Sequence, residues 1–132
     1  MDADDIADVA VAALTDDRHI GEVYELTGPR LLTFAEAVAE IAAASSREVE
    51  YVPVSIEEHA THALADGVPV EVVELLTYLF GEVLDGRNSR LADGVQRALG
   101  RAAKDFRDFA RDAALAGAWD AAMASPRSGR QV

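Results

Sequence analysis

The sequence has no cysteine, which excludes disulfide bonds, thiolate nucleophiles and thiolate-ligated metals. No apolar run approaches the roughly 18 residues that a membrane-spanning helix needs, and no charged segment leads into an apolar stretch at the start. Aromatic residues make up only 6% of the chain, whereas 50% of the residues are apolar. These features predict a cytoplasmic protein of helix-rich composition that does not span a membrane.

The sequence also lacks the glycine-rich loops that bind nucleotides. Neither G-x-G-x-x-G nor G-x-x-x-x-G-K-[ST] occurs anywhere in the chain. One junction, ELTGPRLLTFAEA, has the pattern of a strand, a turn and a helix, but its only glycine is Gly28, followed by Pro29 and two leucines. A dinucleotide loop needs several glycines so that its backbone can approach the pyrophosphate. We therefore expect this junction to turn the chain and to bind no nucleotide.

Basic charge is scarce, because 12 Lys and Arg stand against 24 Asp and Glu and give a net charge of −12. Residues 1–66 hold 15 of the acidic residues and only 3 arginines, so the first half carries the whole imbalance. An acidic surface repels nucleic acid and anionic lipid, and neither is expected as a partner. The basic block from Arg87 to Arg111 is interpreted as a solvated helix face that balances the acidic half.

The chain of 132 residues is long enough for one domain with a hydrophobic core. Segments 22–27 and 48–54 alternate polar and apolar residues, which predicts two half-buried strands. A helix between them would make a right-handed βαβ unit. The predicted fold is α/β and predominantly helical, with helices packed over this small unit. We expect one domain over residues 1–117 and a flexible tail over 118–132.

Helix starts are marked by capping residues. Thr33 and Glu36 form a capping box, as do Ser55 and Glu58, because each pair places a hydroxyl three residues before a glutamate. Further helices are predicted near residues 4–14, 70–85, 95–99 and 105–114, each with apolar residues at helical spacing. The stripe over 70–85 is wide enough to predict burial on most sides.

Two histidines are the first candidates for chemistry. His59 and His62 lie three residues apart on one predicted helix, close enough to share a metal, with Glu58 or His19 as a conceivable third ligand. Since no further ligand is defined by spacing, we predict no metal site. Imidazole titrates near neutral pH, so both histidines remain candidates for general acid–base catalysis.

Other candidates are a carboxylate and two aromatic residues. Asp85 lies at the end of the predicted 70–85 helix and is a candidate acid or base, while Tyr78 and Phe80 are candidates for lining a substrate pocket. Aromatic residues in an apolar helix are also common core residues. No serine lies in a nucleophile-elbow context, so a Ser/His/Asp hydrolase has no support.

Six short segments have a characteristic order and spacing along the chain. They read DDIADVA at 4–10, GEVYELTGP at 21–29, LTFAE at 32–36, VEYVPVS at 49–55, LGR at 99–101 and DF at 105–106. Together they resemble the C-terminal portion of the NmrA-like, atypical short-chain dehydrogenase/reductase family. The resemblance runs over about four fifths of the chain, from residue 4 to 114, and rests on order and spacing rather than on one diagnostic motif.

The resemblance implies an NAD(P)-binding Rossmann domain in whole family members, with its glycine loop in a preceding N-terminal region. In this chain the glycine loop is absent, and no Tyr-x-x-x-Lys pair occurs, because Tyr24, Tyr51 and Tyr78 are followed four residues later by glycine, serine and glutamate. No cofactor-binding residue is therefore expected in this chain. The resemblance also implies that the 22–27 strand extends the Rossmann sheet and that the helices from residue 56 onward cover the substrate crevice.

Three functional hypotheses follow. The first is a substrate-domain-like binding module for a small molecule or protein, present as a homodimer or docked on a separate Rossmann-domain partner. Its motivation is an uncovered strand edge and apolar helix face. The second is a small cofactor-independent enzyme, such as an isomerase, cyclase or hydrolase, that reuses the ancestral pocket. The third is a fragment of a full-length NAD(P)-dependent oxidoreductase. None of these makes the chain alone an independent oxidoreductase.

Overall fold

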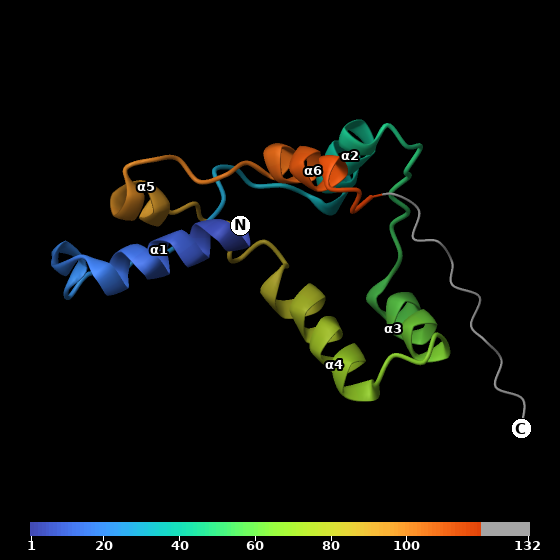
Figure 1. Ribbon diagram of the computed structural model, residues 1–132. Helices are drawn as coiled ribbons and strands as arrows, with labels where there is room; N and C mark the ends of the chain where they lie inside the picture. The colour runs from blue at the N-terminus through green and yellow to red at the C-terminus, as the bar shows by residue number, and fades with distance from the viewer. Residues whose placement is uncertain (120–132) are drawn as a thin grey trace, which may run out of the picture. The chain divides into compact units, whose positions relative to one another are not determined.

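The structure is a computed structural model and describes residues 1–119, so nearly all of the predicted 118–132 tail lies outside the described residues. The described chain is helical (Figure 1). Its elements are α1 (Ala3–Thr15), η1 (Asp17–His19), α2 (Phe34–Ser45), α3 (Ile56–Ala65), α4 (Val70–Tyr78), η2 (Leu79–Val83), α5 (Gly94–Leu99) and α6 (Phe106–Leu115). They form two compact units, the first from residues 1–51 and 91–119 and the second from residues 52–90.

In the first unit, α1 packs against α5 and buries the main apolar cluster (Figure 1). Val9, Val95 and Ala98 are its buried residues. Four partly buried side chains pack against them: Tyr24, Leu26, Leu99 and Ala103. The apolar spacing of the sequence predicted this face only in part, because Val9 is buried whereas Ile6 and Leu14 are 50% and 86% exposed.

A buried carboxylate also holds α1 in place. Asp5 is only 2% exposed, and it accepts hydrogen bonds from the backbone amide of Lys104, at 2.7 Å, and from the guanidinium of Arg101. Burial alone would raise the pKa of Asp5, but these two donors outweigh it and hold the pKa below its ordinary value. Asp5 therefore joins α1 to the segment that follows α5.

The other helix pair of the first unit is α2 with α6, which lie side by side in Figure 1. A network of charges links them. The guanidinium of Arg30 donates to both carboxylate oxygens of Asp105, at 2.7 and 2.8 Å, and to Glu40 at 2.8 Å. Arg107 donates to the same Glu40 at 3.0 Å. Paired, two-pronged contacts of this kind fix orientation better than single ion pairs do.

The predicted strands at 22–27 and 48–54 are wrong for this structure, and the βαβ unit is not seen. No residue of the described chain 1–119 is assigned to a β-strand. Within 22–27, the Glu25 carbonyl accepts from the Gly94 amide at 3.2 Å, and Thr27 Oγ1 accepts from the Ala92 amide at 3.0 Å. A strand needs a ladder of backbone hydrogen bonds to a neighbouring strand, and these contacts to Ala92 and to the first residue of α5 do not supply one.

Both predicted capping boxes are confirmed. The Thr33 hydroxyl accepts from the Glu36 amide at 3.2 Å, and the Glu36 carboxylate accepts from the Thr33 amide at 2.7 Å. Ser55 and Glu58 repeat the arrangement at 3.1 and 2.9 Å. Each box satisfies two amides that would otherwise lack a partner at the start of α2 or α3.

The second unit consists of α3, α4 and η2. Helix α3 packs against α4, and Val73 on α4 is buried at 5% exposure. Gly67, with a φ of +81°, makes the left-handed turn between the two helices, and α4 begins after Pro69. The predicted helix over 70–85 continues beyond Tyr78 as a π-helical turn, η2, which closes with a 2.9 Å bond from the Leu84 amide to the Leu79 carbonyl. In the described part of the chain, no helix combines the length and the apolarity needed to cross a membrane.

Candidate functional site

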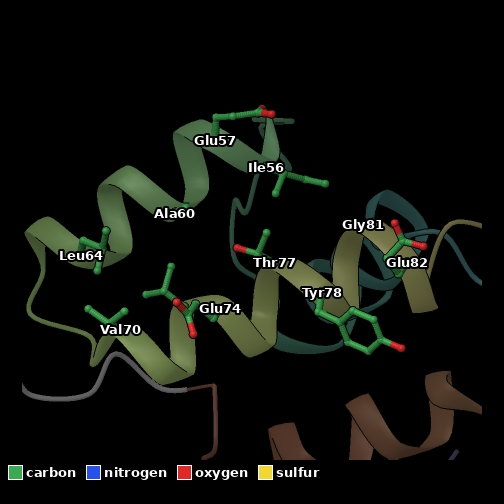
Figure 2. Close-up of a pocket in the computed structure, with 11 residues that line it drawn as sticks. Ile56, Glu57, Ala60, Leu64, Val70, Glu74, Thr77, Tyr78, Gly81 and Glu82 are labelled. Carbon is green, nitrogen blue, oxygen red and sulfur yellow. The ribbon is translucent and has the colours of Figure 1, made fainter.

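An open groove of about 670 Å³ lies between α3 and α4 (Figure 2). Its walls are mostly apolar, with a few polar side chains among them. The lining residues are Ile56, Glu57, Ala60 and Leu64 of α3, Val70, Val73, Glu74, Thr77 and Tyr78 of α4, and Gly81 and Glu82 of η2. All of them belong to the second unit.

The spacing of the lining residues explains how two short helices build this groove. On α4, positions 70, 73, 74, 77, 78 and 81 recur every three or four residues, so they share one side of the helix. On α3, positions 56, 57, 60 and 64 do the same. At Gly81 a side chain would meet Ile56 at 3.4 Å, which shows how closely η2 approaches α3.

The two predicted pocket residues, Tyr78 and Phe80, do not share one site in the structure. Tyr78 lines the groove and is 61% exposed. Phe80 lies outside the lining and packs edge to face against His59, with ring centroids 5.4 Å apart. Residues two apart on a helix point in different directions, so both could not face one groove. The substrate-contacting role of Tyr78 and Phe80 remains a prediction.

The three predicted acid–base residues have different surroundings in the structure. His59 is half-buried against Phe80, and its Nδ1 atom is buried without a hydrogen-bond partner. His62 is exposed. Asp85 is exposed and binds Arg87, whose hydrogen bonds lower the pKa of Asp85 and keep it ionised. Within residues 1–119, no hydrogen bond or ion pair joins these candidates into an imidazole–carboxylate pair.

The third histidine is in the other unit. His19 is buried, its Nδ1 lies 2.7 Å from the Tyr24 hydroxyl, and its Nε2 accepts from the Arg18 guanidinium at 3.1 Å. Because Nε2 accepts, Nδ1 is the atom that donates to Tyr24. His19 thus belongs to the packing around the main apolar cluster. Among the residues that the structure describes, no three His, Asp or Glu side chains are grouped as a metal site.

Comparison with known proteins points to one class of enzyme. The oxidoreductase YesF of Bacillus subtilis is 38% identical over 119 residues, which are 90% of this chain and 41% of YesF. The NAD(P)H azoreductase of Xenophilus azovorans is 35% identical over 116 residues, 88% of this chain and 41% of the azoreductase. A (4-alkanoyl-5-oxo-2,5-dihydrofuran-3-yl)methyl phosphate reductase of Streptomyces griseus is 31% identical, with the same 41% of its length covered. No family model matches the sequence.

These relatives indicate the NmrA-like, atypical short-chain dehydrogenase/reductase family that the sequence resembles, and this chain matches only part of each relative. A solved structure agrees at the level of fold: the triphenylmethane reductase of Citrobacter sp. has a TM-score of 0.72 at 24% identity, over 84% of this chain and 38% of the reductase. The chain spans about two fifths of the length of the curated relatives that it matches. It therefore matches one part of these relatives, as the sequence resemblance predicted.

Most residues of the groove were not predicted from the sequence. Glu57, Glu74 and Leu64 line it, yet none was a candidate from the sequence. The available signal was the shared helix face of Val70, Glu74 and Thr77, where a carboxylate interrupts an otherwise apolar stripe. That signal shows that the face carries a charge among apolar residues. It does not show which helix packs opposite, because that depends on the tertiary structure.

Proposed function

We propose that this chain is the substrate-binding part of an NAD(P)-dependent reductase and that the dinucleotide binds to a different part of the whole enzyme. The observation that carries the proposal is the alignment: about 90% of this chain matches about two fifths of relatives that include an NAD(P)H azoreductase. The sequence agrees with it, because this chain contains no glycine-rich dinucleotide loop.

The proposal gives the two alternating segments a role. In a complete reductase, 22–27 and 48–54 would form strands by pairing with the sheet of the dinucleotide-binding part. The exposed side chain of Val23, 82% exposed here, would then be covered. An alternating segment without a neighbouring strand has the composition for pairing but no partner for its amide and carbonyl groups.

The proposed function also implies a partner for this chain. The dinucleotide-binding part would be the rest of the same protein or a separately encoded Rossmann-domain protein, and a homodimer is the alternative cover for the exposed apolar side chains. The groove between α3 and α4 would face the substrate, with Tyr78 as one contact. The reaction would be reduction of a small organic molecule by NAD(P)H.

Calorimetric titration with NADPH tests where the cofactor binds. The 132-residue chain alone is expected to give no binding heat, because it has no loop that could hold the pyrophosphate. A chimera that joins this chain to the part of the Xenophilus azovorans azoreductase outside the match is expected to bind NADPH and to oxidise it with an azo dye as acceptor. The complete azoreductase is the control.

Two outcomes would contradict the proposal. Tight NADPH binding by the 132-residue chain would show that the cofactor site lies within it. A folded chimera that binds NADPH but oxidises none of it, under conditions where the complete azoreductase does, would show that this chain does not supply a working substrate site.

A further inference from the structure

The groove between α3 and α4 is apolar where the two helices meet. Leu64 of α3 and Val70 of α4 remain 47% and 55% exposed, although both line the groove, and Val73 beneath them is buried. A concave surface of this size, with exposed aliphatic walls, gains free energy when an apolar molecule displaces its water.

The charge of the lining has one sign. Three glutamates belong to it, Glu57, Glu74 and Glu82, and no Lys, Arg or His does. Glu82 is 3.3 Å from Arg87, which neutralises it in part. Glu57 and Glu74 form no ion pair with any residue of the described chain, so their charges remain available to a ligand.

Glu74 has the better position of the two unpaired carboxylates. It lies between Val70 and Thr77 along α4, next to the apolar walls and one turn before Tyr78 (Figure 2). Glu74 is exposed in the free chain, and an apolar ligand seated beside it would displace part of the water that screens its charge. The exposed ring of Tyr78 adds a π face that also attracts positive charge.

We propose that the α3–α4 groove binds an apolar organic cation, with Glu74 and Glu57 selecting its charge and the aliphatic walls binding its hydrocarbon part. This proposal rests on the proposed function, because it names the substrate class of that same site. An anion of equal size would gain the same apolar contacts but would be repelled by both carboxylates. Discrimination between the two thus comes from charge alone.

A pair of ions with one shape and opposite charge provides the test. Tetraphenylphosphonium and tetraphenylborate are titrated into the isotope-labelled 132-residue chain, and the amide signals of α3 and α4 are followed by NMR. The phosphonium ion is expected to shift these signals and to bind about tenfold more tightly than the borate ion, because two carboxylates attract the cation and repel the anion.

Matched variants locate the selectivity. Glu74→Gln is expected to weaken phosphonium binding about three- to fivefold, and the double change with Glu57→Gln more than that, while borate binding is unchanged or improves. Glu71→Gln is the control, because Glu71 is exposed on the same helix but outside the groove lining. Equal binding of the two ions, or an equal loss in the Glu71 and Glu74 variants, would overturn the proposal.

The two proposals fail in different ways. Glu74-dependent phosphonium binding, together with a chimera that binds NADPH and oxidises none, would keep the groove's preference for cations and remove the reductase role. An active chimera whose chain shows no preference for the phosphonium ion would do the reverse.

Discussion

Asp105 has two tasks at the start of α6. Its side chain caps the helix by accepting from the Arg107 amide at 2.8 Å, and it binds the guanidinium of Arg30 with both oxygens. The bond from Arg30 is the main cause that lowers the pKa of Asp105 to about 2, and the Arg107 amide adds to it. One carboxylate therefore joins the chain before α2 to the first turn of α6.

This depressed pKa predicts how stability depends on pH. A carboxyl group whose folded-state pKa lies below its unfolded-state value stabilises the fold above the unfolded value, and this contribution is lost as pH falls through the folded value. For Asp105 the window runs from about pH 4 down to about pH 2. Asp105→Asn keeps a capping oxygen but removes the charge, so it is expected to lower the unfolding midpoint by a few degrees at pH 7.

Circular dichroism melts of both proteins across the window measure this effect. The difference in midpoint between the natural chain and Asp105→Asn should shrink as pH falls from 4 to 2. Asp108→Asn serves as the control, since it removes an equal charge from the same helix and leaves Arg30 paired. A difference that stays constant with pH would show that the charge of Asp105 does not stabilise the fold.

Gly94 allows the closest backbone approach in the first unit. A Cβ atom placed on it would overlap the carbonyl oxygen of Glu25 and lie 2.8 Å from Leu26 Cδ2. Because the obstruction includes backbone, Gly94→Ala is expected to lower the free energy of unfolding by about 1–3 kcal/mol. Gly28→Ala is the matched control, since its nearest atom, the Met1 nitrogen, would be 3.8 Å away. Equal denaturant midpoints for the two variants would contradict the close approach.

The two units differ in the interactions that stabilise them. The first unit combines a small apolar cluster with charge networks through Asp5 and Arg30, whereas in the second unit Val73 is the one apolar residue of residues 52–90 that is fully buried. A helix pair with so little buried apolar surface has low stability of its own. Its groove can then change shape at small energetic cost when a ligand binds.

Val73 and Val9 provide matched tests of this division into units. Val73→Ala is expected to cost about 1–3 kcal/mol and to accelerate amide hydrogen exchange in α3 and α4. Exchange in α1 and α5 should stay unchanged, because they belong to the other unit. Val9→Ala should show the opposite pattern. If either variant accelerates exchange equally in all four helices, the chain unfolds as one unit.

Elements whose signals are local in the sequence were predictable, whereas those that depend on distant neighbours were not. The capping boxes at Thr33 and Ser55 were predictable because each depends on residues only three positions apart. The absence of strands was not predictable. Alternating polar and apolar residues indicate a half-buried segment, but strand pairing depends on a neighbouring strand elsewhere in the fold. Tyr78 was found at the groove, but Glu74 was missed since its environment depends on how α3 docks on α4.

At the scale of the molecule, large apolar side chains are exposed in both units. Leu14, Ile20, Val23 and Leu115 are 78–86% exposed in the first unit, and Leu75 is 62% exposed in the second. Scattered exposed apolar residues are normal, but these accompany segments that have strand-like patterns and no sheet. This combination supports the proposed partner for the first unit.

The second unit is an insertion: the polypeptide leaves the first unit after residue 51 and returns to it at residue 91. The groove lies wholly within this inserted hairpin of helices, and the main apolar cluster lies wholly outside it. Under the proposed function, mutations within residues 52–90 can change ligand preference without disturbing the apolar cluster of the first unit. Exchange of residues 52–90 between relatives would then change the ligand specificity of one scaffold.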